Sequence, residues 1–214
     1  MLRFRGHAQL GLAFEFGIFD WIKGQIASPE HIADWRDCAR TLAGFLKALH
    51  QKDTTGAPCA GARNSRRGVM LSTLTEVALP AIEIVADEVD THRARDLWES
   101  ACAAEFSQQP VWLHGDLKAD NLIVRDGILR GVIDWGLSAV GDPAADYATA
   151  WFWIDSSARS AFRGYLDLND SDWQRGKGWA LYGAVVALSY YRGGRNEALC
   201  QQSRLTLSRL GLLL

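Results

Sequence analysis

The sequence has little excess charge of either sign. Its 214 residues include 23 lysines and arginines and 25 aspartates and glutamates, which gives a formal net charge of −2 at pH 7. Electrostatic binding of nucleic acid or of an anionic membrane surface requires a basic patch. The charge balance therefore predicts neither partner, and it is too close to neutral to indicate a polycationic substrate.

Closely spaced cysteines and long apolar runs are also missing. The four cysteines, Cys38, Cys59, Cys102 and Cys200, are far apart and form no C-x-x-C pair. This spacing argues against a zinc site or a disulfide framework and favours free thiols in a reducing compartment. The longest apolar run, 180–188, is too short to span a membrane. With no signal peptide apparent at the N-terminus, we expect a cytoplasmic protein.

Helical periodicity dominates what is present. The clearest helix is predicted from Ser28 to about His50, with Ser28 as its N-cap and Pro29 at its first position. Apolar residues recur in it every three or four positions, which places them on one face. Residues 53–68 are rich in Gly, Thr, Asn and Arg and are predicted to form a loop.

Further helices are predicted on both sides of a short β-rich region. A helix pair is expected from Pro80, as its first residue, to about Glu105, with a break or a new cap at Asp90 and Thr91. Four more helices are predicted towards the C-terminus, at 144–154, 157–165, 171–191 and 198–210.

Strands are predicted where aromatic and β-branched residues cluster. The segment 14–22 is predicted to be an early strand. Later, 111–113, 121–124 and 129–134 form a compact β-rich region, and the turn 125–127 joins the last two as a hairpin. No internal repeat or low-complexity segment interrupts the pattern.

Polar residues with a distinctive spacing follow the strand at 111–113. His114, Asp116 and Asn121 fit H-x-D-x-x-x-x-N, the spacing of a kinase catalytic loop, and Asp134 opens a D-x-G thirteen residues after Asn121. Phosphoryl transfer needs a carboxylate that orients the attacking hydroxyl and accepts its proton, a role that suits Asp116. It also needs oxygen ligands for Mg²⁺, which Asn121 and Asp134 supply. The segment therefore predicts a phosphotransferase site.

Each of these signatures alone is a common turn, so the prediction depends on their combination. His114 is expected to brace the loop through hydrogen bonds to the backbone. Lys118 lies beside the predicted base and is a candidate to stabilise the charge of the transferring phosphate.

The chain resembles the aminoglycoside phosphotransferase family. The strongest resemblance is carried by His114–Leu117, Asp120–Leu122, Val132–Gly136 and Gly141–Asp146. Weaker resemblance is carried by Phe19–Gly24, which is similar to the hinge strand of the family, by Leu42–His50, which is similar to its first large helix, and by Arg63–Gly68.

The resemblance implies a kinase-like α+β fold that is mainly helical, with a small β-hairpin catalytic region in a large C-terminal lobe. It implies ATP and Mg²⁺, a small-molecule acceptor with a hydroxyl group, and the same roles for Asp116, Asn121 and Asp134. By the same resemblance, Asp146 would anchor the catalytic loop. Trp21 and Ile22 would belong to the hinge that contacts the nucleotide.

The sequence departs from the family pattern at its N-terminus. Only about twenty residues precede Trp21; they contain no G-x-G-x-x-G, and the first lysine is Lys23. We therefore expect residues 1–24 to be a remnant of the N-terminal lobe and hinge, and 25–214 to form the C-terminal lobe. A misplaced start codon, a shortened relic and completion by another polypeptide all fit. Apolar side chains around the hinge would be exposed and would favour self-association.

Two other functions remain open from the sequence. A missing N-terminal lobe suits a non-catalytic binding or interaction module, and His114, Asp116 and Asp134 would be the ligands of a metal-dependent hydrolase. The acceptor is not identified. Four acids that suit a polycation are more simply solvated surface: Asp155, Asp167, Asp170 and Asp172. Six aromatic residues are more simply explained by helix packing than as a platform for a sugar: Trp151, Trp153, Trp173, Trp179, Tyr190 and Tyr191.

Overall fold

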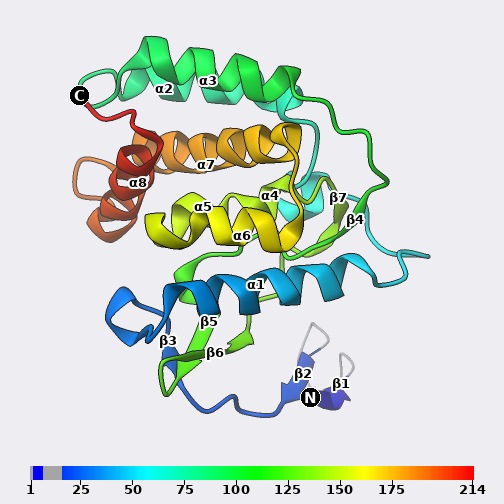
Figure 1. Ribbon diagram of the computed structural model, residues 1–214. Coiled ribbons are helices and arrows are strands. Elements are labelled where there is room, and N and C mark those ends of the chain that lie inside the picture. The colour runs from blue at the N-terminus through cyan, green and yellow to red at the C-terminus, as the bar shows by residue number, and fades with distance from the viewer. Residues whose placement is uncertain (1, 7–15) are drawn as a thin grey trace.

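The computed structural model describes residues 2–6 and 16–214, and helices dominate this part of the chain (Figure 1). The helices are α1 (Trp35–His50), α2 (Thr75–Ile84), α3 (Thr91–Ala103), α4 (Ala144–Tyr147), α5 (Thr149–Phe152), α6 (Arg159–Leu166), α7 (Asp170–Tyr191) and α8 (Glu197–Leu210). Single 3-10 turns occur at Pro29–His31, Ala62–Asn64, Leu71–Leu74, Ala119–Asn121 and Ser156–Ala158.

The strands are short and form three small antiparallel sheets. They are β1 (Leu2–Gly6), β2 (Phe16–Phe19), β3 (Gln25–Ile26), β4 (Val111–Leu113), β5 (Leu122–Arg125), β6 (Ile128–Val132) and β7 (Ala139–Gly141). β1 pairs with β2, β5 lies between β3 and β6, and β4 pairs with β7. The predicted architecture, mainly helical with a small β-hairpin region, is confirmed.

The helices stack in layers above the β3–β5–β6 sheet. In Figure 1, α1 lies next to this sheet, α7 lies between α2–α3 and α4–α6, and α8 crosses one end of the stack. The largest side chains at the centre are at most 1% exposed, among them Trp98, Phe162 and Trp179. Within the described residues, no helix is both long and apolar enough to cross a membrane.

The first helix begins later than predicted. The Ser28 hydroxyl bonds to His31 Nδ1 (2.7 Å) rather than capping, and it precedes only a single 3-10 turn. Helix α1 begins after Asp34, whose carboxylate accepts from the amides two and three residues further on (2.7 and 3.1 Å). Between the two caps, the amide of Ala33 donates to the carbonyl of Gly127 (3.1 Å). This tertiary contact holds the chain against the β5–β6 turn. It lies between the 3-10 turn Pro29–His31 and helix α1, so the two do not join into one helix.

The prediction that Pro80 begins a helix is also wrong. Pro80 lies inside α2, which continues directly from the 3-10 turn before it. The next helix does have a new cap, because the Asp90 carboxylate accepts from the amide of Arg93 (3.1 Å) at the start of α3.

The predicted β-rich region divides between two sheets. β5 and β6 form the expected hairpin, with its turn at Asp126 and Gly127, but β4 pairs with β7 instead. β3 and β7, with two and three residues, were not predicted. The early strand is shorter than expected, since β2 covers 16–19; residues 14 and 15 lie outside the described part. The division of the chain at residue 24 stays a prediction.

Candidate active site

A fully buried carboxylate fixes the loop between β4 and β5. Asp146, on α4, accepts hydrogen bonds from the amides of His114 (2.6 Å) and Gly115 (2.8 Å). Burial raises the pKa of the Asp146 carboxyl, and these two amide hydrogen bonds oppose the rise. Because two backbone donors share one side chain, the loop has a fixed position relative to α4, as expected of a residue that anchors it.

The buried ring of His114 connects this loop to the next. Its Nε2 lies 2.9 Å from the carbonyl oxygen of Ile133, and its Nδ1 is 3.3 Å from the amide of Asp116. This pattern fits a neutral ring with its proton on Nε2, donating to the carbonyl and accepting from the amide. The ring also contacts Trp135 edge to face, with centroids 5.0 Å apart. His114 therefore contacts backbone and packing groups, in line with its predicted bracing role.

Asp116 is held by two neighbours and remains accessible. Asn121 Nδ2 donates both to the backbone oxygen of Asp116 (2.8 Å) and to its Oδ2 (3.0 Å). Lys118 Nζ lies 3.2 Å from the same Oδ2, and the Asp116 side chain is 24% exposed. Since the Asn121 amide nitrogen uses its hydrogens on Asp116, its Oδ1 is left to accept or to coordinate.

Asp134 follows the neighbouring strand and has an exposed carboxylate. Its backbone is in the left-handed region, with φ of 62°, a conformation that Asp tolerates better than most residues. The amide of Ile133, just before it, donates to the backbone oxygen of Asn121 (2.9 Å). This bond places Asn121 and Asp134 on adjacent segments at one end of the hairpin.

The oxygen atoms of Asn121 and Asp134 suit Mg²⁺, which takes few protein ligands and completes its shell with phosphates and water. Among the described residues, no group of three or more His, Cys, Asp or Glu is arranged to hold a metal.

A cavity of about 440 Å³ opens beside Asp116. One wall is the loop that carries Asp116 and Lys118, and most of the remaining wall comes from α5, α7 and α8. The segment 27–29, Arg67 and Ala145 of α4 complete it. The volume lies in the range of small-molecule sites. The structure therefore brings Asp116 and Lys118 to the edge of a space large enough for a small compound.

The two predicted hinge residues lie elsewhere. Trp21 is 88% exposed and Ile22 is 37% exposed, and neither lines this cavity. Ile22 lies over β6, where a Cβ on Gly131 would be 2.7 Å from its Cδ1. Their contact with a nucleotide stays a prediction.

A buried ion network connects α7 to the start of α4, the helix that carries Asp146, and it was not predicted. Arg175, on α7, is 3% exposed; its Nε lies 2.7 Å from Asp142 Oδ2 and its Nη2 lies 2.8 Å from Asp172 Oδ1. Asp142 Oδ1 accepts from the amide of Ala144 (3.0 Å), the first residue of the helix that carries Asp146. Burial raises the pKa of Asp142, and Arg175 opposes the rise. A lone arginine in a helix gives no signal in sequence, although Asp142 lies in a recognisable motif.

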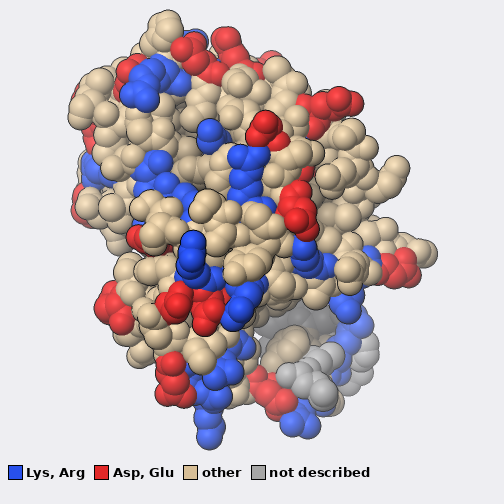
Figure 2. All heavy atoms as spheres, in the orientation of Figure 1, with Lys and Arg blue, Asp and Glu red and all other residues tan. Residues whose placement is uncertain are grey.

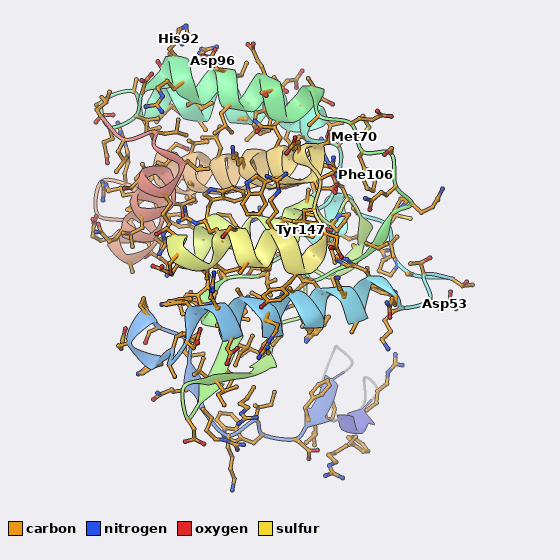
Figure 3. All side chains as sticks on the ribbon, viewed as in Figure 1. Asp53, Met70, His92, Asp96, Phe106 and Tyr147 are labelled. Carbon is orange, nitrogen blue, oxygen red and sulfur yellow. The ribbon has the colours of Figure 1, made fainter. Side chains whose placement is uncertain are left out.

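The guanidinium of Arg175 has two further neighbours near the start of α7. It donates to the carbonyl of Glu105, and it lies 5.1 Å from the centroid of the Phe106 ring. Figure 3 labels Phe106 beside this end of α7, with Tyr147 below it on α4. The segment after α3 is thus attached to the same network that supports α4.

Comparison with known proteins identifies the family. Residues 4–179 match the family described as "Phosphotransferase enzyme family". The chain belongs to this family. An aminoglycoside 3'-phosphotransferase from Escherichia coli is a relative of this phosphotransferase family member, 31% identical over 125 residues. That match covers 58% of this chain and 44% of the relative, so the chain aligns with less than half of the relative's length.

Solved structures share the fold at lower identity. The GDP and kanamycin complex of APH(2")-IIia has a TM-score of 0.64 at 18% identity, over 99% of this chain and 75% of that one. The apoenzyme of macrolide 2'-phosphotransferase MphH from Brachybacterium faecium has a TM-score of 0.54 at 19% identity, over 88% and 69%. These likenesses concern the fold and confirm that this family member has the predicted phosphotransferase architecture.

Proposed function

We propose that this chain transfers the terminal phosphoryl group of ATP, with Mg²⁺, to a hydroxyl group of a small molecule. The observation that carries the proposal is the Asp116 carboxylate at the edge of the cavity, held by Asn121 and Lys118. Membership of the phosphotransferase family and relatives named as phosphotransferases support the class of reaction.

In the proposed reaction, Asp116 orients the acceptor hydroxyl and takes its proton. The acceptor oxygen forms a bond to the terminal phosphorus, the bond from that phosphorus to the bridging oxygen breaks, and the nucleoside diphosphate leaves. Asn121 keeps Asp116 in place through one hydrogen bond to its carboxylate and one to its backbone oxygen. Lys118, with its ammonium group 3.2 Å from the same carboxylate, is placed to offset negative charge on the phosphoryl group.

Asn121 Oδ1 and the Asp134 carboxylate are the groups that would hold Mg²⁺. The ion, bound between them and the nucleotide phosphates, would neutralise phosphate charge. We assign Trp21 and Ile22 to the nucleotide side of the site, because both precede β3 and Ile22 lies over β6, the strand that leads to Asp134. GDP is the nucleotide named for one solved neighbour, so ATP and GTP should both be tested.

The first test is nucleotide binding, because it needs no knowledge of the acceptor. Mg-ATP at 100 times its dissociation constant should add about 2.7 kcal/mol to the free energy of unfolding, which shifts the melting temperature by a few degrees. A folded chain that shows no shift with Mg-ATP or Mg-GTP would contradict the proposal and favour the non-catalytic binding module.

The second test is turnover, measured as nucleoside diphosphate released with a panel of hydroxyl compounds. Asp116→Asn should lower the rate by about 10²- to 10⁴-fold, because it removes the base but keeps the shape of the side chain. Asp126→Asn is the matched control, since Asp126 is an exposed acid in the β5–β6 turn. Equal activity of the two variants would overturn the role given to Asp116.

A further inference from the structure

We infer that the acceptor of this site is an uncharged or anionic hydroxyl compound with an apolar body, and not a polycation. The inference rests on the proposed function, which makes the cavity beside Asp116 the acceptor site.

The helical walls of the cavity carry almost no charge. The wall residues from α5, α7 and α8, together with Trp153 directly after α5, have mainly apolar or small side chains. Arg209 is the one ionisable residue among them. Among the described residues, the wall with its loops holds three cations, Arg67, Lys118 and Arg209, and two acids, Asp116 and Asp120. A ligand with several ammonium groups would have to lose water there with only Asp120 and the Lys118-paired Asp116 as carboxylate partners, at a high cost in free energy.

The positive charge of Arg209 is fixed in position. Its Nη1 donates to the carbonyl oxygens of Trp151 (2.9 Å) and Phe152 (2.7 Å) at the end of α5. These neutral partners hold the guanidinium without neutralising it. A cationic ligand that extends from Asp116 towards α8 would meet this like charge, whereas an anionic or uncharged ligand would not.

The nearby acids that would suit a polycation are engaged elsewhere. Asp167 pairs with Lys47 (2.8 Å), Asp170 pairs with Arg163, and Asp172 binds the buried Arg175. Asp155 accepts from the amide and hydroxyl of Ser157, and Glu197 pairs with Arg204. None of these acids lines the cavity. On the face shown in Figure 2, acidic and basic side chains are interspersed, and the acids form no continuous patch.

The polar groups left without partners in the wall are donors. Trp179 is 1% exposed and lines the cavity, and among the described residues its indole nitrogen has no hydrogen-bond partner. The buried Nε of Arg67, which also lines the cavity, has none either. Donors of this kind are satisfied by carbonyl, ether, hydroxyl or carboxylate oxygens and not by ammonium groups. The charge of the wall and its unpartnered donors both favour an uncharged or anionic ligand.

Calorimetric binding without nucleotide tests the inference separately from turnover. Three probes share one scaffold and differ in charge: 4-nitrophenyl β-D-glucoside, uncharged; the corresponding glucuronide, anionic; and the 2-amino-2-deoxy glucoside, cationic. Kanamycin serves as the polycation. The wild type should bind the uncharged and anionic glycosides about 3- to 10-fold more tightly than the amino glycoside, given one like charge at moderate distance.

A charge introduced into the wall should change this preference. Gln202→Glu, on the exposed side of α8 and in the cavity wall, should improve binding of the amino glycoside and of kanamycin and weaken binding of the glucuronide. Gln201→Glu, an equally exposed neighbour outside the wall, should leave the ranking unchanged.

Three results would overturn the inference: tighter binding of kanamycin or the amino glycoside by the wild type, equal effects of the two glutamate variants, or no binding of the uncharged and anionic glycosides at millimolar concentration. Because no nucleotide is present, a chain that fails to transfer phosphate would still reveal its charge preference. A chain that transfers phosphate to a polycation would uphold the proposed function and overturn this inference alone.

Discussion

The two loops that make up the candidate site are held in different ways. The loop 114–121 is fixed from several directions, by Asp146 on its amides, by the His114 ring and by Asn121 on Asp116. The loop that begins at Asp134 is shaped by its backbone and by the packing of Trp135, and Asp134 itself is exposed to solvent. The first loop is organised by the protein, whereas the second presents a solvent-exposed carboxylate that a ligand can reach.

This difference indicates how the proposed work is divided. Groups that position a reacting atom need rigid support, because small displacements cost much of the rate. A metal ligand that acts together with phosphates can be fixed by the ion itself. We therefore expect substitutions in the first loop to act on folding and function together, and substitutions at Asp134 to act on nucleotide binding alone.

The largest expected effect is at the buried support of the first loop. Asp146→Ala leaves the amides of His114 and Gly115 buried without an acceptor, at about 1–3 kcal/mol for each. Urea unfolding should show the sum for both amides, a loss of roughly 2–6 kcal/mol. Asp146→Asn retains one carbonyl oxygen and should fall between the alanine variant and the wild type. An unchanged midpoint in Asp146→Ala would mean that the loop does not depend on this residue.

The next effect should separate the second loop from the first. Asp134→Asn keeps a side chain that tolerates positive φ, so the free energy of unfolding without ligand should change by less than about 0.5 kcal/mol. The stabilisation by Mg-ATP, about 2.7 kcal/mol at 100 times the dissociation constant, should be mostly lost. Thermal unfolding with and without Mg-ATP measures both quantities. If the Asp134→Asn protein were destabilised without ligand but still stabilised normally by Mg-ATP, Asp134 would support the fold and not nucleotide binding.

The stability of the protein is expected to depend on pH through His50, which packs against α4. His50, at the end of α1, lies 6.0 Å from the Tyr147 ring, and burial lowers its pKa from 6.5 to about 4. Below pH 6.5, His50 is protonated in the unfolded chain, but in the folded chain it stays neutral until the pH falls to about 4. Stability from this group is therefore complete above pH 6.5 and falls as pH drops to 4, by up to about 3 kcal/mol.

His50→Gln isolates this contribution, because glutamine does not titrate. Denaturant midpoints of the wild type should decrease between pH 7 and 5, and those of the variant should decrease less. Parallel pH profiles for the two proteins would show that His50 is protonated as easily in the folded chain as in the unfolded one.

The smallest effect concerns the exposed apolar residues of the hinge region. Phe19 is 67% exposed and Trp21 is 88% exposed, so we predict self-association at high protein concentration. Trp21→Ser should weaken it by roughly 1–2 kcal/mol, the usual size for an aromatic contact at an interface. Sedimentation velocity over a wide concentration range measures this, with Leu214→Ser, another exposed apolar residue (81%), as control. A wild type that is monomeric throughout would contradict the prediction.

The parts of the molecule with local signals were predictable. Periodicity predicted α7 and α8 to within one residue at each end, because each has a long helical pattern. The Asp126–Gly127 turn predicted the β5–β6 hairpin, since both residues adopt positive φ there. The predicted strands 121–124 and 129–134 included Asn121 and Asp134, whereas the structure places Asn121 just before β5 and Asp134 two residues after β6.

What depends on distant contacts was not predictable. Ser28 and Asp34 are both acceptable helix caps, and only the contact of Ala33 with Gly127 separates them. β7 has the sequence Ala-Val-Gly, in which only Val140 favours a strand, and it is recognised only beside β4. The cavity depends on how α5, α7 and α8 meet, so the positions of Trp179 and Arg209 in its wall had no signal in the sequence.

The short strand β7 also bears on the order in which the chain folds. Val140 pairs with Trp112 on one side, and on the other its amide donates to Pro58 and its carbonyl accepts from Ala60 (2.8 Å each). This one residue joins three segments that are far apart along the chain, whereas α7 and α8 are neighbours in sequence. Closing such long loops is slow compared with pairing adjacent helices. We therefore expect helical hairpins to form early and the contacts of β7 with β4 and with residues 58–60 to form late. Substitutions that weaken these contacts should accelerate unfolding more than they slow folding.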